Sequence, residues 1–146
     1  MVTKHLEKLP IEKAHLKVLD YGCGSKAFLS GLLAIKDIPV TNYDLFYFPD
    51  QDVFRRNYHA ITATEVWEHL YNPREEISRL ASILKPGGIL AVMTSGHKGE
   101  GHFHDWHYRR DLTHVSFFSE KTMRTLAAEL GLNLVKAQSP FWYFVK

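Results

Sequence analysis

The sequence predicts an α/β fold, in which a doubly wound, mostly parallel β-sheet carries helices on both faces and ends in an antiparallel strand pair. Two observations support this prediction: apolar runs of strand length alternate with segments of helical periodicity, and glycine or proline separates them. The chain has 146 residues, of which 45% are hydrophobic and 23% charged, as is typical of a globular domain. We expect a leader over residues 1–16 and one domain over residues 17–146.

The first three predicted elements form a βαβ unit. The run "LKVLDYG" indicates a buried strand, and "SKAFLSGLLAIK" indicates a helix because its large apolar residues fall on one face. These residues are Phe28, Leu29, Leu32 and Leu33. "IPVTNYD" then predicts a second strand, which ends at Asp44. Residues 45–57 are too few for a helical crossover and another strand, so we expect the strand ending at Asp44 to form an edge of the sheet.

The second half of the chain continues the alternation. "YHAITATEV" predicts a third strand, and Asn72 as N-cap before Pro73 predicts a helix that "KPGG" ends, before the strand "ILAVMT". Residues 95–118 indicate a long polar and aromatic loop. Ser119 is placed to cap the last helix, and "LNLVKA" and "FWYFVK" predict the closing antiparallel pair.

Composition gives no support for a nucleic-acid-binding, membrane-spanning or disulfide-bonded protein. Lys and Arg number 18 against 16 acidic residues, so the net charge of +2 gives no support for a nucleic-acid partner. The run "GILAVM" is too short to cross a bilayer, and "MVTKHLEKLP" has no apolar signal core. The lone Cys23 has no internal disulfide partner. We expect a cytoplasmic protein with no membrane contact.

The stretch "DYGCGSKA" predicts a nucleotide-type cofactor site. Gly22, Gly24 and Ala27 follow the G-x-G-x-x-A spacing, in which missing side chains let a cofactor approach the backbone. A nicotinamide site or a tight strand-to-helix turn would also fit this spacing. Asp20 before the glycines and Asp44 at the end of the next strand favour a cofactor with a cationic amino-acid portion and a ribose.

With these residues the chain resembles the class I S-adenosylmethionine-dependent methyltransferases. The matching pieces are "VLDYGCG", "YD", "EVWEHLYNP", "LKPGGILAVMT" and "THVSFFSEKT", in the order that this family shows. The resemblance implies a Rossmann-like fold, in which Asp20, Gly22 and Gly24 hold the methionine portion of S-adenosylmethionine and Asp44 holds its ribose. It also implies cofactor contacts at Tyr21, Lys26, Leu45, Thr64 and Glu65.

Two departures from the family are visible in the sequence. Lys26 stands where the family often has a third glycine, and a lysine there can pair with the carboxylate of the cofactor. The usual third strand has no counterpart between Asp44 and Tyr58, so the wall beside the adenine must come from residues 45–63.

The stretch "TATEVWEHLYNP" predicts a divalent metal site. Glu65, Glu68 and His69 have spacings of three and four, which on a helix share one face. The E-x-x-E-H pattern followed later by His114 resembles a subset of the family that includes small-RNA ribose and ubiquinone-pathway O-methyltransferases, in which it holds a cation. Magnesium, manganese, iron and zinc are all compatible with these ligands. In the alternative interpretation this segment only closes the cofactor pocket. An inverted zinc-protease motif is a poorer match, because Glu65 stands where its first histidine belongs.

The sequence "DWHYRRDLTH" supplies the acid-base candidates. We expect His107, Tyr108 and His114 to be catalytic and this segment to lie over the methyl group of the cofactor. The alternative is an ordered loop whose charges pair with each other. The predicted function is O-methylation of a small molecule or a sugar hydroxyl, and a homodimer is compatible with the short leader. A non-catalytic cofactor-binding module that regulates or scaffolds a partner is the alternative class.

Overall fold

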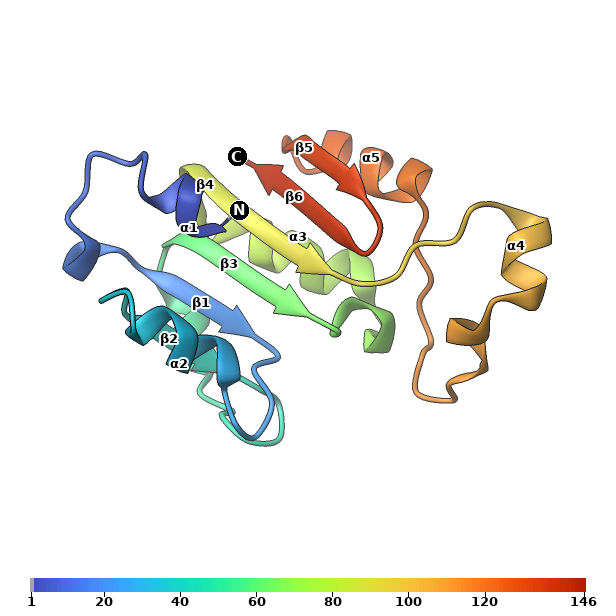
Figure 1. The fold of residues 1–146 in the computed structure, drawn as a ribbon, viewed down its shortest axis with the longest axis horizontal. Helices are drawn as coiled ribbons and strands as arrows, with labels where there is room; N and C mark the ends of the chain where they lie inside the picture. The colour runs from blue at the N-terminus through green and yellow to red at the C-terminus, as the bar shows by residue number, and fades with distance from the viewer. Residues whose placement is uncertain (1) are drawn as a thin grey trace.

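A six-stranded sheet forms the centre of the molecule in a computed structural model that describes residues 2–146 (Figure 1). The strands are β1 (Val18–Tyr21), β2 (Val40–Tyr43), β3 (Tyr58–Thr64), β4 (Leu84–Met93), β5 (Asn133–Gln138) and β6 (Phe141–Val145). Their order in the sheet is β2-β1-β3-β4-β6-β5. The first four strands are parallel, whereas β6 runs antiparallel to both β4 and β5. This topology confirms the predicted fold class.

Helices lie on both faces of this sheet. The α-helices are α1 (Val2–Leu6), α2 (Phe28–Ala34), α3 (Pro73–Ser82), α4 (Glu100–Asp105) and α5 (Glu120–Glu129). α1 and α2 lie on one face and α3 and α5 on the other, while α4 projects beyond the carboxyl ends of the strands (Figure 1). Within residues 2–146, no helix is long and apolar enough to cross a membrane.

Alternation along the strands separates two hydrophobic cores. Val18, Ala60 and Ile89 are neighbours across β1, β3 and β4, and they join the core under α1 and α2. The next residues along each strand, among them Leu19 and Ile61, face the larger core under α3 and α5. A parallel strand with helices on both sides therefore needs apolar residues at successive positions, as β1 and β3 have.

β2 is an edge strand, as predicted. Residues 45–57 contain no strand. Phe48 forms an isolated antiparallel bridge with Asp44, and a 3-10 turn covers Gln51–Arg55. The usual third strand is therefore absent from the sheet.

The predicted starts of two helices are confirmed, whereas the predicted loop after the first of them is not. α3 begins at Pro73 directly after Asn72 as predicted, although the Asn72 side chain makes no capping hydrogen bond. Ser119 begins α5 with its side chain accepting the N–H of Thr122. The "KPGG" segment does not form a separate loop before the strand. It belongs to β4, whose first residue pairs with Tyr58, and an irregularity between that pair and Ala60 absorbs the extra residues.

The predicted apolar face of α2 is only half correct. Leu33 is buried and Leu29 packs against the same core, but Phe28 and Leu32 are 72% and 63% exposed. α2 lies at the edge of the sheet, because no strand of the described residues follows β2 on that side. In this part of the chain no further crossover helix is therefore present to cover the outer side of α2. Residues 1–16, predicted as a leader, also contribute to the hydrophobic core, because Leu6 and Leu16 are buried there.

We predict that Gly22→Ala destabilises the fold far more than Gly24→Ala. Both glycines have a positive φ, of 75° and 65°, which costs an alanine about 1 kcal/mol. A Cβ at position 22 would also lie 2.3 Å from Cγ2 of Val66, whereas nothing lies within 4 Å of one at position 24. Overpacking adds about 1–3 kcal/mol at position 22 only. Urea unfolding of the two variants measures the difference, and equal losses would contradict the steric argument.

Candidate functional site

The glycine turn follows β1 and is tied to the end of β2. The N–H groups of Gly22 and Cys23 donate to the carbonyl oxygen of Tyr43, and the N–H of Gly24 donates to Asp44 Oδ2 at 3.0 Å. Asp44 Oδ1 accepts the N–H groups of residues 46 and 47. The carboxylate predicted to hold a ribose therefore lies beside the turn predicted to hold the amino-acid portion.

Asp20 is a buried carboxylate beneath this turn, with 4% of its surface exposed. The hydroxyl of Thr62 donates to its Oδ1 at 2.8 Å. Burial raises the pKa of Asp20 above its ordinary value of 3.8, although the Thr62 hydrogen bond opposes the shift. A cation bound at this carboxylate would compensate for the loss of water around it.

Other predicted cofactor residues differ in their placement. The side chain of Tyr21 turns away from the rim into the α3 core, where its hydroxyl donates to Glu76 Oε2. Lys26, Leu45 and Thr64 are exposed. Burial and the nearby carboxylates raise the pKa of the Cys23 thiol to about 11, so this thiol stays protonated at neutral pH.

The helix predicted through Glu65, Glu68 and His69 does not form. Glu65 follows β3 with φ of 54°, a left-handed conformation, and only the short 3-10 turn Trp67–His69 follows. The left-handed conformation of Glu65 interrupts helical geometry here, and the side chain of the next residue, Val66, packs against Gly22.

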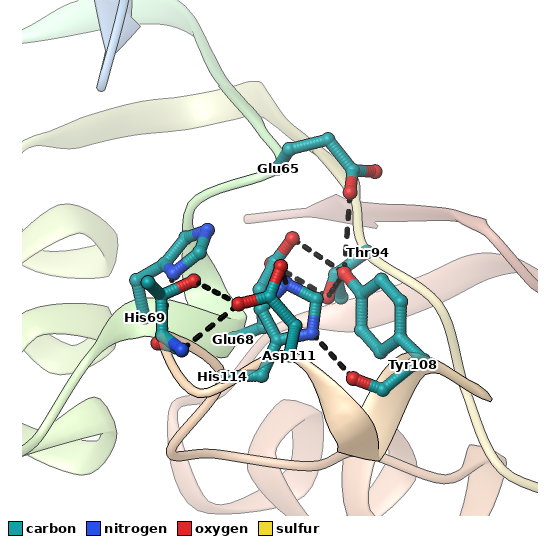
Figure 2. A network of polar contacts seen from close by, with 8 residues as sticks. Glu65, Glu68, His69, Thr94, Tyr108, Asp111 and His114 are labelled. Carbon is teal, nitrogen blue, oxygen red and sulfur yellow. Dashed lines mark hydrogen bonds and ion pairs between the residues drawn. The ribbon is translucent and has the colours of Figure 1, made fainter. Parts of the chain in front are cut away.

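Glu68 is nonetheless the centre of the site, because it has no exposed surface and accepts from several segments (Figure 2). Its Oε2 accepts the hydroxyl of Thr94 at 2.8 Å, and its Oε1 accepts the hydroxyl of Tyr108. Its main-chain carbonyl accepts the N–H groups of Val115 and Ser116. Thr94 was not predicted as a site residue; its polar side chain at the carboxyl end of a central strand was the available signal.

In both histidines Nδ1 lies within hydrogen-bond distance of a main-chain carbonyl oxygen. Nδ1 of His69 lies 2.9 Å from the carbonyl oxygen of Thr113, and Nδ1 of His114 lies 2.7 Å from that of Tyr108. A carbonyl oxygen only accepts, so each Nδ1 carries the hydrogen, and each neutral ring keeps a lone pair on Nε2. Ligand atoms of Glu68, His69 and His114 all lie within 4.8 Å of one another.

Glu65 stands apart from that group of three. Its Oε2 lies 3.2 Å from the hydroxyl oxygen of Tyr108, and its pKa is raised by burial and by the neighbouring Glu68. The pKa of Tyr108 is also raised by burial and by Glu68, so its phenol stays protonated and acts as a donor. Asp111 Oδ2 lies 3.8 Å from His114 Nε2, and hydrogen bonds from Thr113 lower the pKa of this carboxyl.

The 95–118 segment is more structured than the predicted loop. It contains α4 and a 3-10 turn over His107–Arg110, and Trp106 stacks on Tyr108 with 5.0 Å between ring centroids. Side chains including Phe103 and Arg109 line a cavity of about 630 Å³ in this segment. His107 is exposed, and the structure does not bring it to the carboxylate–histidine group.

The site and the sheet together define a class of protein. A parallel sheet with a glycine turn after its first strand, an acid after its second and a second polar group on the same rim is the architecture of class I S-adenosylmethionine-dependent methyltransferases. The chain belongs to the family described as a methyltransferase domain, whose sequence profile matches residues 2–137. Family membership supports an enzyme over a non-catalytic module and over a nicotinamide oxidoreductase.

Solved structures with similar folds are methyltransferases of low sequence identity. A Bacillus halodurans protein assigned as a methyltransferase has a TM-score of 0.66 and 16% identity, over 92% of this chain and 70% of its own. An O-methyltransferase of neocarzinostatin biosynthesis, solved with S-adenosylmethionine and 2-hydroxy-5-methyl naphthoic acid, has a TM-score of 0.64 and 20% identity, over 92% of this chain and 50% of its own. The mitomycin 7-O-methyltransferase has a TM-score of 0.64 and 12% identity, over 97% of this chain and 51% of its own. A search of curated protein sequences gave no match.

We predict that Asp20→Asn flattens the pH dependence of stability. A carboxyl whose pKa is raised on folding binds its proton more tightly in the native state, so native stability falls as pH rises above 3.8 and through the raised pKa. The asparagine variant lacks this loss, and its stability relative to native protein should increase across that range. Thermal unfolding between pH 4 and 7 measures the difference, and a constant offset would contradict the prediction.

Proposed function

We propose that the protein transfers the methyl group of S-adenosylmethionine to a hydroxyl of a small molecule or a sugar, at a site that holds a divalent metal. The observation that carries the proposal is the convergence of Glu68, His69 and His114 within 4.8 Å at the rim where the glycine turn lies.

The glycine turn is suited to S-adenosylmethionine. The space beside Gly24 is open, and Asp20 offers a buried carboxylate to the amino group of the cofactor. Asp44, next to the turn, is placed to accept the ribose hydroxyls. S-adenosylmethionine held there would supply an electrophilic methyl group. The acceptor oxygen would bond to this carbon as the carbon–sulfur bond breaks, which leaves S-adenosylhomocysteine and releases the hydroxyl proton.

The donor set is suited to a transition metal more than to magnesium. Two imidazoles and one carboxylate match zinc, manganese or iron, whereas magnesium prefers oxygen ligands and bound water. The hydrogen bonds from each Nδ1 to a main-chain carbonyl orient both rings, as partners of metal-binding histidines commonly do. A metal held here would lower the pKa of an acceptor hydroxyl.

Residues around this group have separate tasks. The protonated Tyr108 and the hydroxyl of Thr94 hold both oxygens of Glu68, which fixes the orientation of the carboxylate. The cavity in the 95–118 segment offers the acceptor an apolar surface at Phe103 and charges of both signs at Arg109 and Glu100. The neocarzinostatin enzyme was solved with a naphthoic acid, which supports an aromatic acid or phenol among the first acceptors to test.

We predict that His114→Ala weakens binding of manganese or zinc by about tenfold or more, because one of three ligands is lost. Binding of S-adenosylhomocysteine should change little, since the glycine turn and Asp44 are separate from His114. His15→Ala is the matched control, because His15 is an exposed residue of the leader. Isothermal titration of each variant measures both ligands. Equal metal affinity in the two variants would show that the group is structural.

We predict that Asp44→Asn weakens binding of S-adenosylhomocysteine by roughly tenfold to a hundredfold, because a charged acceptor of ribose hydrogen bonds is lost. Asp37→Asn is the control, as Asp37 is exposed, lies after α2 and already has a positive φ that asparagine tolerates. Unchanged affinity in Asp44→Asn would place the ribose elsewhere.

A further inference from the structure

A second polar site lies at the opposite end of the sheet from the methyltransferase site. A cavity of about 650 Å³ opens there between residues 9–11 and the segments that begin β3 and β4. One wall is apolar and includes Leu9 and Ile11, and the other includes His59, Lys85 and Lys146.

His59 is a buried ring whose protonation state is fixed by its neighbour. It is 8% exposed, and its Nδ1 accepts the main-chain N–H of Lys17 at 2.9 Å. An imidazole nitrogen that accepts an N–H carries no hydrogen itself, so the neutral ring must carry its hydrogen on Nε2. Burial and the charges of Lys85 and Lys17 lower the pKa of His59, which favours the neutral ring.

The Nε2–H group of His59 lies next to a second hydrogen-bond donor, the ammonium of Lys85, and not next to an acceptor. Nζ of Lys85 lies 3.2 Å from Nε2, and a lysine ammonium has three donors and no acceptor. The two groups therefore cannot satisfy each other while the lysine is charged. With the two nitrogens 3.2 Å apart, one oxygen of an anion placed beside both could accept from the His59 Nε2–H and from the Lys85 ammonium.

The charged side chains that line the cavity are all cationic. Among the described residues that line it there is no aspartate or glutamate. Within residues 2–146 no carboxylate lies within ion-pair distance of Lys85. Nζ of Lys146 donates instead to the carbonyl oxygens of Ala81 and Ser82, the last two residues of α3. An anion in the cavity would thus meet uncompensated positive charge.

We propose that this cavity binds a phosphate group, either free or as a phosphate monoester, between His59 Nε2–H and the ammonium of Lys85. The apolar wall at Leu9 and Ile11 would cover the organic part of a monoester. The site is separate from the cofactor rim, and its occupant would stabilise the native fold whether or not methyl transfer occurs.

The test measures phosphate binding to the full chain by isothermal titration and thermal unfolding, against sodium chloride at equal ionic strength and without added metal. Inorganic phosphate and phenyl phosphate are the probes. We expect both to raise the unfolding temperature, with phenyl phosphate the tighter ligand if the apolar wall is used. Lys85→Met should weaken phosphate binding by about tenfold or more, because a charge-assisted contact is lost.

Lys36→Met is the matched control, because Lys36 is an exposed lysine after α2 and away from the cavity. It should bind phosphate as native protein does. NMR of the His59 ring gives a second readout that does not depend on a variant folding, and we expect hydrogen on Nε2. No binding, equal weakening in both lysine variants, or a ring with its hydrogen on Nδ1 would overturn the proposal.

Discussion

The arrangement of the candidate site depends on one buried carboxylate, Glu68, whose hydrogen bonds join three parts of the chain. Its side chain accepts from Thr94 after β4 and from Tyr108 in the 95–118 segment, while its main-chain carbonyl accepts from residues 115 and 116. A carboxylate without solvent is costly unless donors replace the lost water, so these contacts are a condition of its burial. The same contacts bring His114 beside His69. Positions far apart in the sequence thus form one group because a single charge must be satisfied.

The two ends of the sheet have opposite electrostatic character. Carboxylates gather where the parallel strands end, at Asp20, Asp44 and Glu68, and the loop from α4 onward returns histidines to them. Where β3 and β4 begin, His59 and Lys85 meet with no acid between them in the described part of the chain. The first end suits a cationic cofactor and a metal, and the second suits an anion. Two kinds of ligand can therefore act on one sheet without competing for a surface.

Sequence patterns predicted the strands, the βαβ unit, the missing third strand, the start of α3 and the cap of α5, because each rests on local chemistry. They failed where contacts distant in sequence decide the backbone. Glu65 to His69 have helical spacing, but Glu65 has a left-handed φ, and only a short 3-10 turn follows it. The apolar residues of α2 predicted burial, but nothing in their spacing shows that the sheet ends beside them. His69 and His114 were predicted as a pair only through family resemblance, since no local pattern reports that residues 69 and 114 meet.

The absence of a strand beyond β2 has a consequence for association between chains. An open sheet edge presents unpaired N–H and C=O groups to which a strand of another molecule can add. Here the open edge spans only the four residues Val40–Tyr43, about 13 Å of strand. The mutual hydrogen bonds of Asp44 and Phe48 turn the chain back immediately afterward. A truncated sheet can therefore leave one side uncovered and still offer too short a template for intermolecular β-pairing to propagate.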